Sequence, residues 1–178
     1  MNTDDQTPDE ILAHVGPGGP VMAAREWVRI ACHERDFVGS LRITDPMLSL
    51  AGAQDWLWRN GSHPNVVRFD RDEAARALAD GDEKHPLWRP FVDTQFQRMD
   101  QVWSDGLNFD EYGVGSRPRP IAPDYELVVF IRNEDKVIRF DKPTPVLAHQ
   151  FLMHRTDAGW LVAGFSDRIP TPGWPPQL

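Results

Sequence analysis

Residues 125–132 read YELVVFIR, and this stretch decides the fold class. Alternate residues of a strand point to opposite faces of a sheet, so Tyr125, Leu127, Val129 and Ile131 would form one uniformly apolar face. The residues between them form a mixed face that begins and ends with a charged side chain. β-Branched and aromatic residues, which favour strands, dominate the stretch. It is therefore predicted to be a strand that buries at least one face.

More strands are expected on the C-terminal side of this stretch. Turn residues and prolines separate three further segments with strand composition, at residues 136–141, 146–155 and 160–166. Both faces of the later segments are also largely apolar, whereas a sheet with one face in water would alternate more cleanly. Something besides the helices is therefore expected to cover the second face: a partner subunit in the first place, and the Pro-rich tail in the second.

The N-terminal part of the chain shows the 3.6-residue apolar spacing of helices. Pro20 suits the first position of a helix, and Asp36 and Asp45 are candidates to cap two more. A short helix is expected over residues 72–79, and the strongest periodicity predicts one over 88–103. Helices first and strands last are typical of α+β architecture. We therefore predict N-terminal helices packed on a curved antiparallel sheet.

The chain of 178 residues is expected to form one domain over residues 20–168. Residues 1–19 are expected to be a loose leader, and residues 169–178, with four prolines, an extended tail. Trp174 is expected to hold this tail over the sheet. The PxxP spacing within residues 172–175 leaves a second interpretation open, a peptide ligand for a proline-binding groove.

Composition excludes several classes of function. The net charge is −8, with 19 Lys and Arg against 27 Asp and Glu, so a binder of nucleic acid or of anionic lipid is not expected. A single cysteine, Cys32, excludes an intrachain disulfide and a multi-cysteine metal site. The polar, acidic start lacks the features of a secretion signal, and no apolar run is long enough for a membrane span. A cytoplasmic location is therefore expected.

Metal and cofactor motifs are incomplete in this chain. His33 and Glu34 begin like the helical motif of zinc proteases, but Phe37 stands where the second histidine is needed. The acidic residues between 70 and 83 lack the order of a calcium loop. The glycine clusters do not follow a strand and open a phosphate-binding helix. No metal or cofactor is therefore expected, and Cys32 is interpreted as a small buried hydrophobe.

The chain resembles the nuclear transport factor 2-like superfamily, in its SnoaL-like branch, from about Pro20 to Pro176. The resemblance is carried by residues 24–31, by Arg35-Asp36-Phe37, by residues 151–162 and by the order of helices before strands. Members share a curved sheet wrapped on helices, a cone with a pocket, and many are dimers. The resemblance therefore implies a pocket for a small apolar molecule and a homodimer.

The resemblance does not choose an activity, because this fold hosts isomerases, cyclases, other enzymes and binding modules. An enzyme of this kind is expected to use cofactor-free acid/base chemistry, such as isomerisation or cyclisation. The alternative is a non-catalytic interaction or dimerisation module that binds through an exposed strand face carrying Val128, Phe130 and Trp160.

His149 and Tyr125 are the candidate catalytic residues. His149 shares an apolar strand face with Phe151, so it is either a general acid/base or a structural residue with a hydrogen-bond partner. The hydroxyl of Tyr125 is either an acid or substrate anchor, or part of a packed core. The aromatic residues that are candidates to line a pocket are Trp27, Trp88, Phe96, Trp103 and Phe151.

Overall fold

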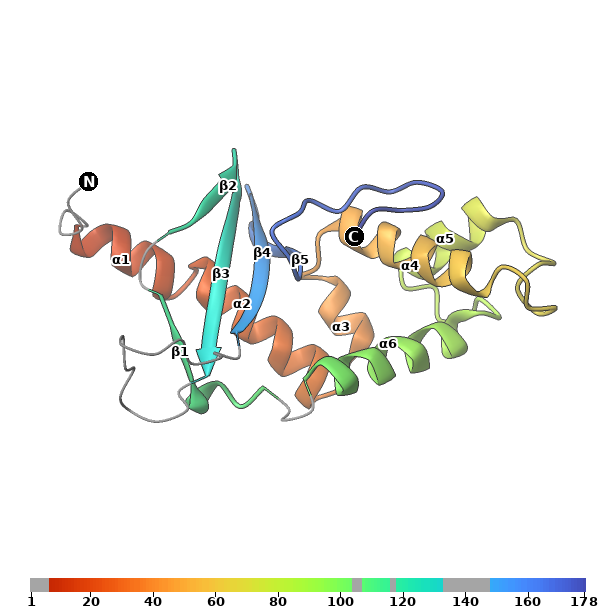
Figure 1. Cartoon of the computed structure of the whole chain (residues 1–178), viewed down its shortest axis with the longest axis horizontal. Coiled ribbons are helices and arrows are strands. Elements are labelled where there is room, and N and C mark those ends of the chain that lie inside the picture. Colours follow the sequence, from red (N-terminus) through yellow and green to blue (C-terminus); the bar gives the residue numbers. More distant parts are fainter. Residues whose placement is uncertain (1–6, 104–106, 116–117, 133–147) are drawn as a thin grey trace, which may run out of the picture.

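The computed structural model describes residues 7–103, 107–115, 118–132 and 148–178. Helices precede a curved, open antiparallel sheet, so the predicted α+β class is confirmed (Figure 1). The predicted strand over residues 136–141 lies outside the described residues.

The helices match the predicted order, with one addition at the start. They are α1 (Pro8–Val15), α2 (Pro20–Val28), α3 (Phe37–Leu41), α4 (Pro46–Asn60), α5 (Arg71–Ala79) and α6 (Trp88–Val102). A π-helical turn, Arg29–His33, continues α2. Asp36 and Asp45 cap α3 and α4 through their side chains, as predicted, and Asp70 caps α5 in the same way.

Helix α1 lies within the segment predicted to be a loose leader. Thr7 and Glu10 form a reciprocal capping box around its first turn, which satisfies backbone donors that a helix start otherwise leaves unpaired. His14 is buried; its Nδ1 pairs with the Glu126 carboxylate, and its Nε2 lies 3.1 Å from the carbonyl oxygen of Gly115. These contacts attach α1 to the sheet, so the predicted leader is a packed helix from residue 8 onward.

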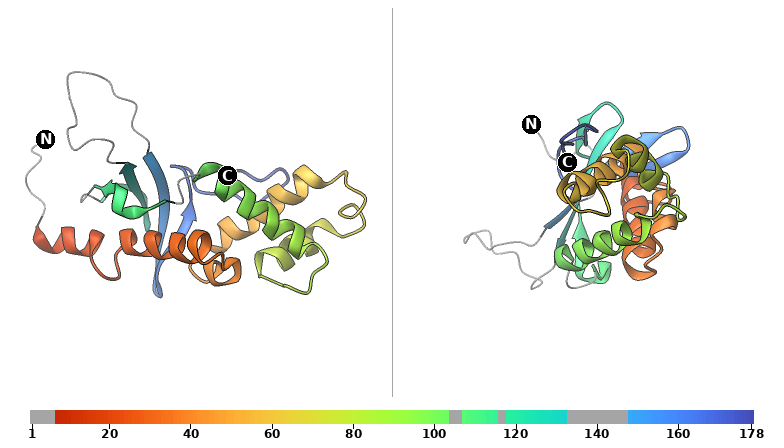
Figure 2. Two further views of the ribbon diagram at one scale, coloured as in Figure 1. Left: turned by 90° about the horizontal axis from the view of Figure 1, so that it is seen from below. Right: turned by 90° about the vertical axis from the view of Figure 1, so that its right-hand side faces the viewer.

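The strands are β1 (Tyr112–Val114), β2 (Pro120–Ala122), β3 (Tyr125–Arg132), β4 (Ala148–Thr156) and β5 (Gly159–Gly164). Within the described residues they form one antiparallel sheet in the order β1-β3-β4-β5, and β2 pairs with the start of β3. The central register places Val128 opposite Phe151 and Phe130 opposite His149. Helices α1 and α2 run along one face of this sheet (Figure 2).

The face of β3 that α2 covers is the mixed face, not the uniformly apolar one. Val128 and Phe130 are fully buried in the core beneath α2, and Trp160 packs against the same core. The proposal of an exposed interaction face made of these three residues is therefore wrong. Both faces of the strand are apolar, so alternation alone could not determine which one the helices would cover.

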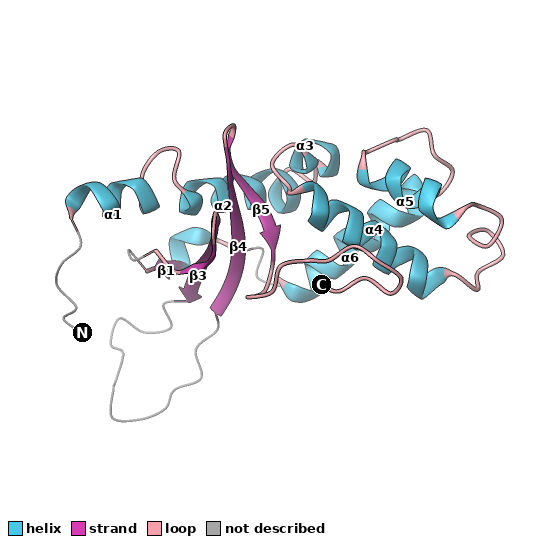
Figure 3. Ribbon diagram, turned by 90° about the horizontal axis from the view of Figure 1, so that it is seen from above, coloured by secondary structure: helices cyan, strands magenta, loops and turns pink. Residues whose placement is uncertain are grey.

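The uniformly apolar face of β3 points away from α2. Ile131 on this face is 38% exposed, and Ile121 on neighbouring β2 is 44% exposed. Leu127 and Leu152, which pair on this face, are buried, and Pro170 of the tail lies beside Leu152. Trp174, however, does not hold the tail over the sheet as predicted. Instead the Gly173 N–H donates to Gln54 of α4 at 2.8 Å, and the Trp174 indole N–H donates to Asp72 of α5 at 2.8 Å (Figure 3). A buried or packed indole N–H usually finds a hydrogen-bond acceptor, and the acceptor for Trp174 is Asp72, which lies on helix α5 and not on the sheet.

Two hydrophobic cores result, one at each end of an elongated molecule (Figure 1). The first lies between α2 and the sheet and contains Trp27, Phe130 and Phe151. The second lies among the later helices and contains Trp56 and Phe91.

Candidate functional site

A cavity lies between the two cores, at the end of β5. Five residues line both its outer part, of about 320 Å³, and its inner part, of about 90 Å³: Leu48, Gly52, Gln95, Met99 and Phe165. We call this cavity the junction hollow. The outer part alone falls within the size range of small-molecule sites, about 300–1,000 Å³.

Two helices supply half of the residues that line the outer part, because their sequences place residues at helical spacing on the side facing the cavity. In α4 these are Leu48 and Gly52, four residues apart, and in α6 they are Gln95, Arg98, Met99 and Val102. The thioether of Met99 is a flexible apolar group that adapts to the shape of a neighbour. The wall is therefore mostly apolar, on two stable elements.

Gly52 has no steric reason to be glycine. It lies in the middle of α4 with a helical backbone, and a Cβ built there would meet no atom within 4 Å. Glycine inside a helix costs about 0.8–1 kcal/mol relative to alanine. The residue therefore lowers helix stability while leaving open the space on which it borders.

Gln95 places a polar group in this apolar wall. Its Nε2 is buried and has no hydrogen-bond partner among the described residues. Leaving a buried donor unsatisfied costs about 1–3 kcal/mol. An acceptor atom on a bound molecule would remove this cost.

Arg98 is the one charged side chain among the described residues that line either part of the hollow. Its Nη1 lies 3.2 Å from Oδ2 of Asp55 on α4. The same carboxylate accepts from Nε of Arg59 at 2.8 and 2.9 Å. The rim of the hollow therefore carries two guanidinium groups that share one carboxylate.

His149 lies in the sheet core, one layer behind the hollow. Its Nδ1 accepts from the Trp103 indole at 3.2 Å, and its Nε2 lies 3.2 Å from the Tyr112 hydroxyl. Because an indole nitrogen only donates, this arrangement fits a neutral imidazole with its proton on Nε2. Trp103 separates the ring from the hollow, since its own side chain lines the outer cavity.

Tyr125 lies on the opposite face of the sheet from His149. It stacks on His154, with ring centroids 4.3 Å apart and an angle of 6° between the planes. The Nδ1 of His154 in turn lies 2.5 Å from Oδ2 of Asp45. Burial, followed by the charges of Asp45 and Asp124, raises the pKa of the Tyr125 phenol. The structure therefore does not bring the two candidate catalytic residues together.

The five candidate pocket aromatics divide between the hollow and the cores. Trp27 lines the inner cavity and Trp103 the outer one. Phe151 is buried behind Trp103, stacked at 6.0 Å and 15°. Trp88 and Phe96 pack against Phe37 in the helical part instead, at 5.8 and 6.1 Å. The sequence did not identify Gly52 or Gln95 as residues of a site. Only Gly52 gave a signal, because glycine is unfavourable in the middle of a helix.

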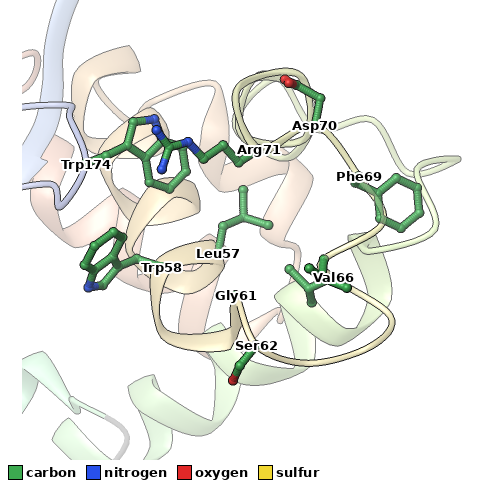
Figure 4. A pocket seen from close by; sticks show the side chains of 10 residues that line it. Leu57, Trp58, Gly61, Ser62, Val66, Phe69, Asp70, Arg71 and Trp174 are labelled. Atoms are coloured by element: carbon green, nitrogen blue, oxygen red, sulfur yellow. The ribbon is translucent and has the colours of Figure 1, made fainter.

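A second cleft, of about 500 Å³, lies at the far end of α4 beside the tail (Figure 4). Two of its charged groups are already engaged within the protein. The carboxylate of Asp70 caps α5, and the Arg71 guanidinium lies 4.7 Å from the centre of the Trp174 ring. This cleft therefore offers less to a ligand than the junction hollow does.

Metal and thiol chemistry find no support among the described residues. No three His, Cys, Asp or Glu side chains are grouped there so as to hold a metal ion. Burial, followed by the charge of Asp100, raises the pKa of the Cys32 thiol to about 12. A thiol with such a pKa is protonated near neutral pH, which agrees with its interpretation as a buried hydrophobe.

Comparison with known proteins finds no matching family model, no matching curated protein and no matching solved structure. Membership of the nuclear transport factor 2-like superfamily therefore stays a prediction. Among the described residues, none of the helices combines the length and apolar character that crossing a membrane requires.

Proposed function

We propose that this protein binds a small, mostly apolar molecule in the junction hollow. The observation that carries the proposal is the open space beside Gly52, into which a side chain larger than a methyl group would project. The unpartnered Nε2 of Gln95 adds a donor for one polar atom of that molecule. An apolar pocket with few polar groups is the usual form of a small-molecule site.

The residues that line the junction hollow favour binding over acid/base catalysis, because the described ones include no histidine, tyrosine or carboxylate side chain that could exchange a proton with a bound molecule. Arginine stays protonated in proteins, so Arg98 is not a proton donor or acceptor for a reaction. His149 is held between Trp103 and Tyr112, and Tyr125 lies on the other side of the sheet. A role as carrier, sensor or ligand-dependent regulator therefore fits better than isomerisation or cyclisation.

The test uses 1-octanol and indole as apolar probes, each measured by thermal shift. A ligand at a hundred times its Kd stabilises a protein by about 2.7 kcal/mol, so both probes are expected to raise the Tm of the wild type. Gly52→Leu fills the hollow and should abolish this shift. Gly52→Ala is the matched control: it should raise stability by about 1 kcal/mol and retain binding. Equal shifts in the wild type and the leucine variant would refute the proposal.

A second candidate function is self-association through the sheet face that the helices leave uncovered. The exposed side chain of Ile131 at the end of β3 favours it, with the half-buried Val129 two residues away on the same face. The occupant we propose is a second copy of the chain, because one apolar face can pair with itself about a two-fold axis. Sedimentation equilibrium tests it: the wild type should be a dimer and Ile131→Lys a monomer. A monomeric wild type at high concentration contradicts it.

A further inference from the structure

The rim of the junction hollow holds an unbalanced cluster of charges. Arg98 and Arg59 are positive, and Asp55, which both contact, is negative. Asp55 is largely buried between them, whereas Arg59 extends into solvent. Counting one positive charge for each arginine and one negative charge for Asp55, the cluster carries one positive charge in excess.

This cluster is built into the helices that form the hollow. Asp55 follows Gly52 by three residues on α4, and Arg98 follows Gln95 by three residues on α6. Residues three apart lie on the same side of a helix. The ion pair between Asp55 and Arg98 therefore joins the two walls of the hollow directly beside its unpartnered amide.

We propose that the molecule bound in the junction hollow is an apolar monocarboxylate whose carboxylate is held by Arg98. This inference rests on the proposed function and names the chemical class of its ligand. The apolar body occupies the outer cavity between Leu48, Met99 and Trp103. Its carboxylate lies at the rim, within reach of Arg98 and of the Gln95 amide.

The charge and shape of the cluster favour a carboxylate over other anions. A guanidinium presents parallel N–H donors that match the two oxygens of a carboxylate. The excess of one positive charge balances a monoanion and leaves a dianionic phosphate half compensated. The protein as a whole carries a charge of −8, so an anion finds no general attraction to its surface, and the preference has to be local.

The experiment compares three probes with the same chain length by isothermal titration calorimetry: octanoate, 1-octanol and octylammonium. Octanoate is expected to bind the wild type about tenfold more tightly than 1-octanol, and octylammonium more weakly than either. Arg98→Met should bring the Kd for octanoate to about the same value as the Kd for 1-octanol, because it removes the charge and keeps an unbranched apolar side chain in the wall. Gly52→Leu should abolish the binding of all three probes.

Two variants outside the wall test the charge count itself. Arg59→Met leaves one arginine for one carboxylate, and it should weaken octanoate binding about two- to fivefold. Asp55→Asn frees both arginines and should strengthen octanoate binding. Arg59→Met should not change the Kd for 1-octanol, because the Arg59 side chain is exposed and does not line the cavity. Asp55→Asn alters the contact between α4 and α6, so its effect is measured as the ratio of the Kd for 1-octanol to the Kd for octanoate, which should rise.

The outcomes separate this inference from the proposed function. If the wild type bound octanoate and 1-octanol equally well and Gly52→Leu bound neither, the proposal of a carboxylate ligand would be overturned. The proposal that the junction hollow binds an apolar molecule would stand. An equal loss of both probes in Arg98→Met would show that Arg98 only joins α4 to α6, and it would overturn the inference as well. Binding that does not depend on Gly52 would overturn both.

Discussion

The imidazole of His149 is held between two aromatic side chains in the core, and this arrangement predicts a structural role. His149→Leu would leave the Trp103 indole N–H without this acceptor and would remove one contact of the Tyr112 hydroxyl. Urea unfolding should show a loss of about 1–3 kcal/mol. His149→Asn should lose less, because its side-chain oxygen can still accept from the indole. An unchanged free energy of unfolding in the leucine variant would contradict this role.

The partly buried thiol of Cys32 predicts both its reactivity and a dependence of stability on pH. With a pKa of about 12, it should react with iodoacetamide at pH 8 at least about a hundredfold more slowly than the urea-unfolded chain. The folded pKa lies above the unfolded one, so the thiol's stabilising contribution is complete below pH 9 and is lost as the pH rises toward 12. Cys32→Ala should flatten that alkaline loss. Equally fast alkylation of the folded and unfolded chains would refute the assignment.

Helix α1 is attached to the sheet in part by the largely buried contact between His14 and Glu126, so the effects of changing these two residues should be coupled. His14→Leu or Glu126→Leu alone leaves a buried polar group without its partner and should lower stability by about 1–3 kcal/mol. Amide hydrogen exchange in residues 8–15 should accelerate in each single variant. The double variant should recover much of the loss, because two apolar side chains can then pack together. Additive losses in the double variant would contradict this coupling.

Elements whose signals are local could be predicted from the sequence. Asp36 and Asp45 were identified as caps from the residues beside them, and α6 from its apolar spacing. Thr7, Pro8 and Glu10 carry the same kind of local signal for α1, although residues 1–19 are predicted to be a loose leader.

Features that depend on contacts between distant elements could not be predicted. The covered face of β3 was one, because both faces are apolar and packing decides between them. The position of Trp174 was another, since its acceptor Asp72 lies on α5. The candidate site was predicted only in part. Trp27 and Trp103 were predicted to line a pocket and do line the hollow. Gln95 was not predicted, because its role depends on its position opposite α4 in the folded chain.

At the scale of the whole molecule, the tail connects the helical end to the hollow. Pro170 and Leu178 line the outer cavity, and between them the chain forms a loop closed by hydrogen bonds of 2.8 and 3.0 Å between Thr171 and Gln177. The tip of this loop is fixed on α4 and α5 through Gly173 and Trp174. The shape of the hollow should therefore depend on an attachment that lies outside it.

This dependence predicts that Trp174→Ala weakens binding in a cavity that Trp174 does not line. Loss of the indole removes its hydrogen bond to Asp72 and its stacking on Arg71, which should free the loop and displace Pro170 and Leu178. We expect the Kd for 1-octanol to rise about three- to tenfold, since each contact contributes about 0.5–1.5 kcal/mol. Trp58→Ala is the matched control, because Trp58 lines the same cleft as Trp174 but belongs to α4 (Figure 4). Equal effects of the two tryptophan variants would show that the tail does not shape the hollow.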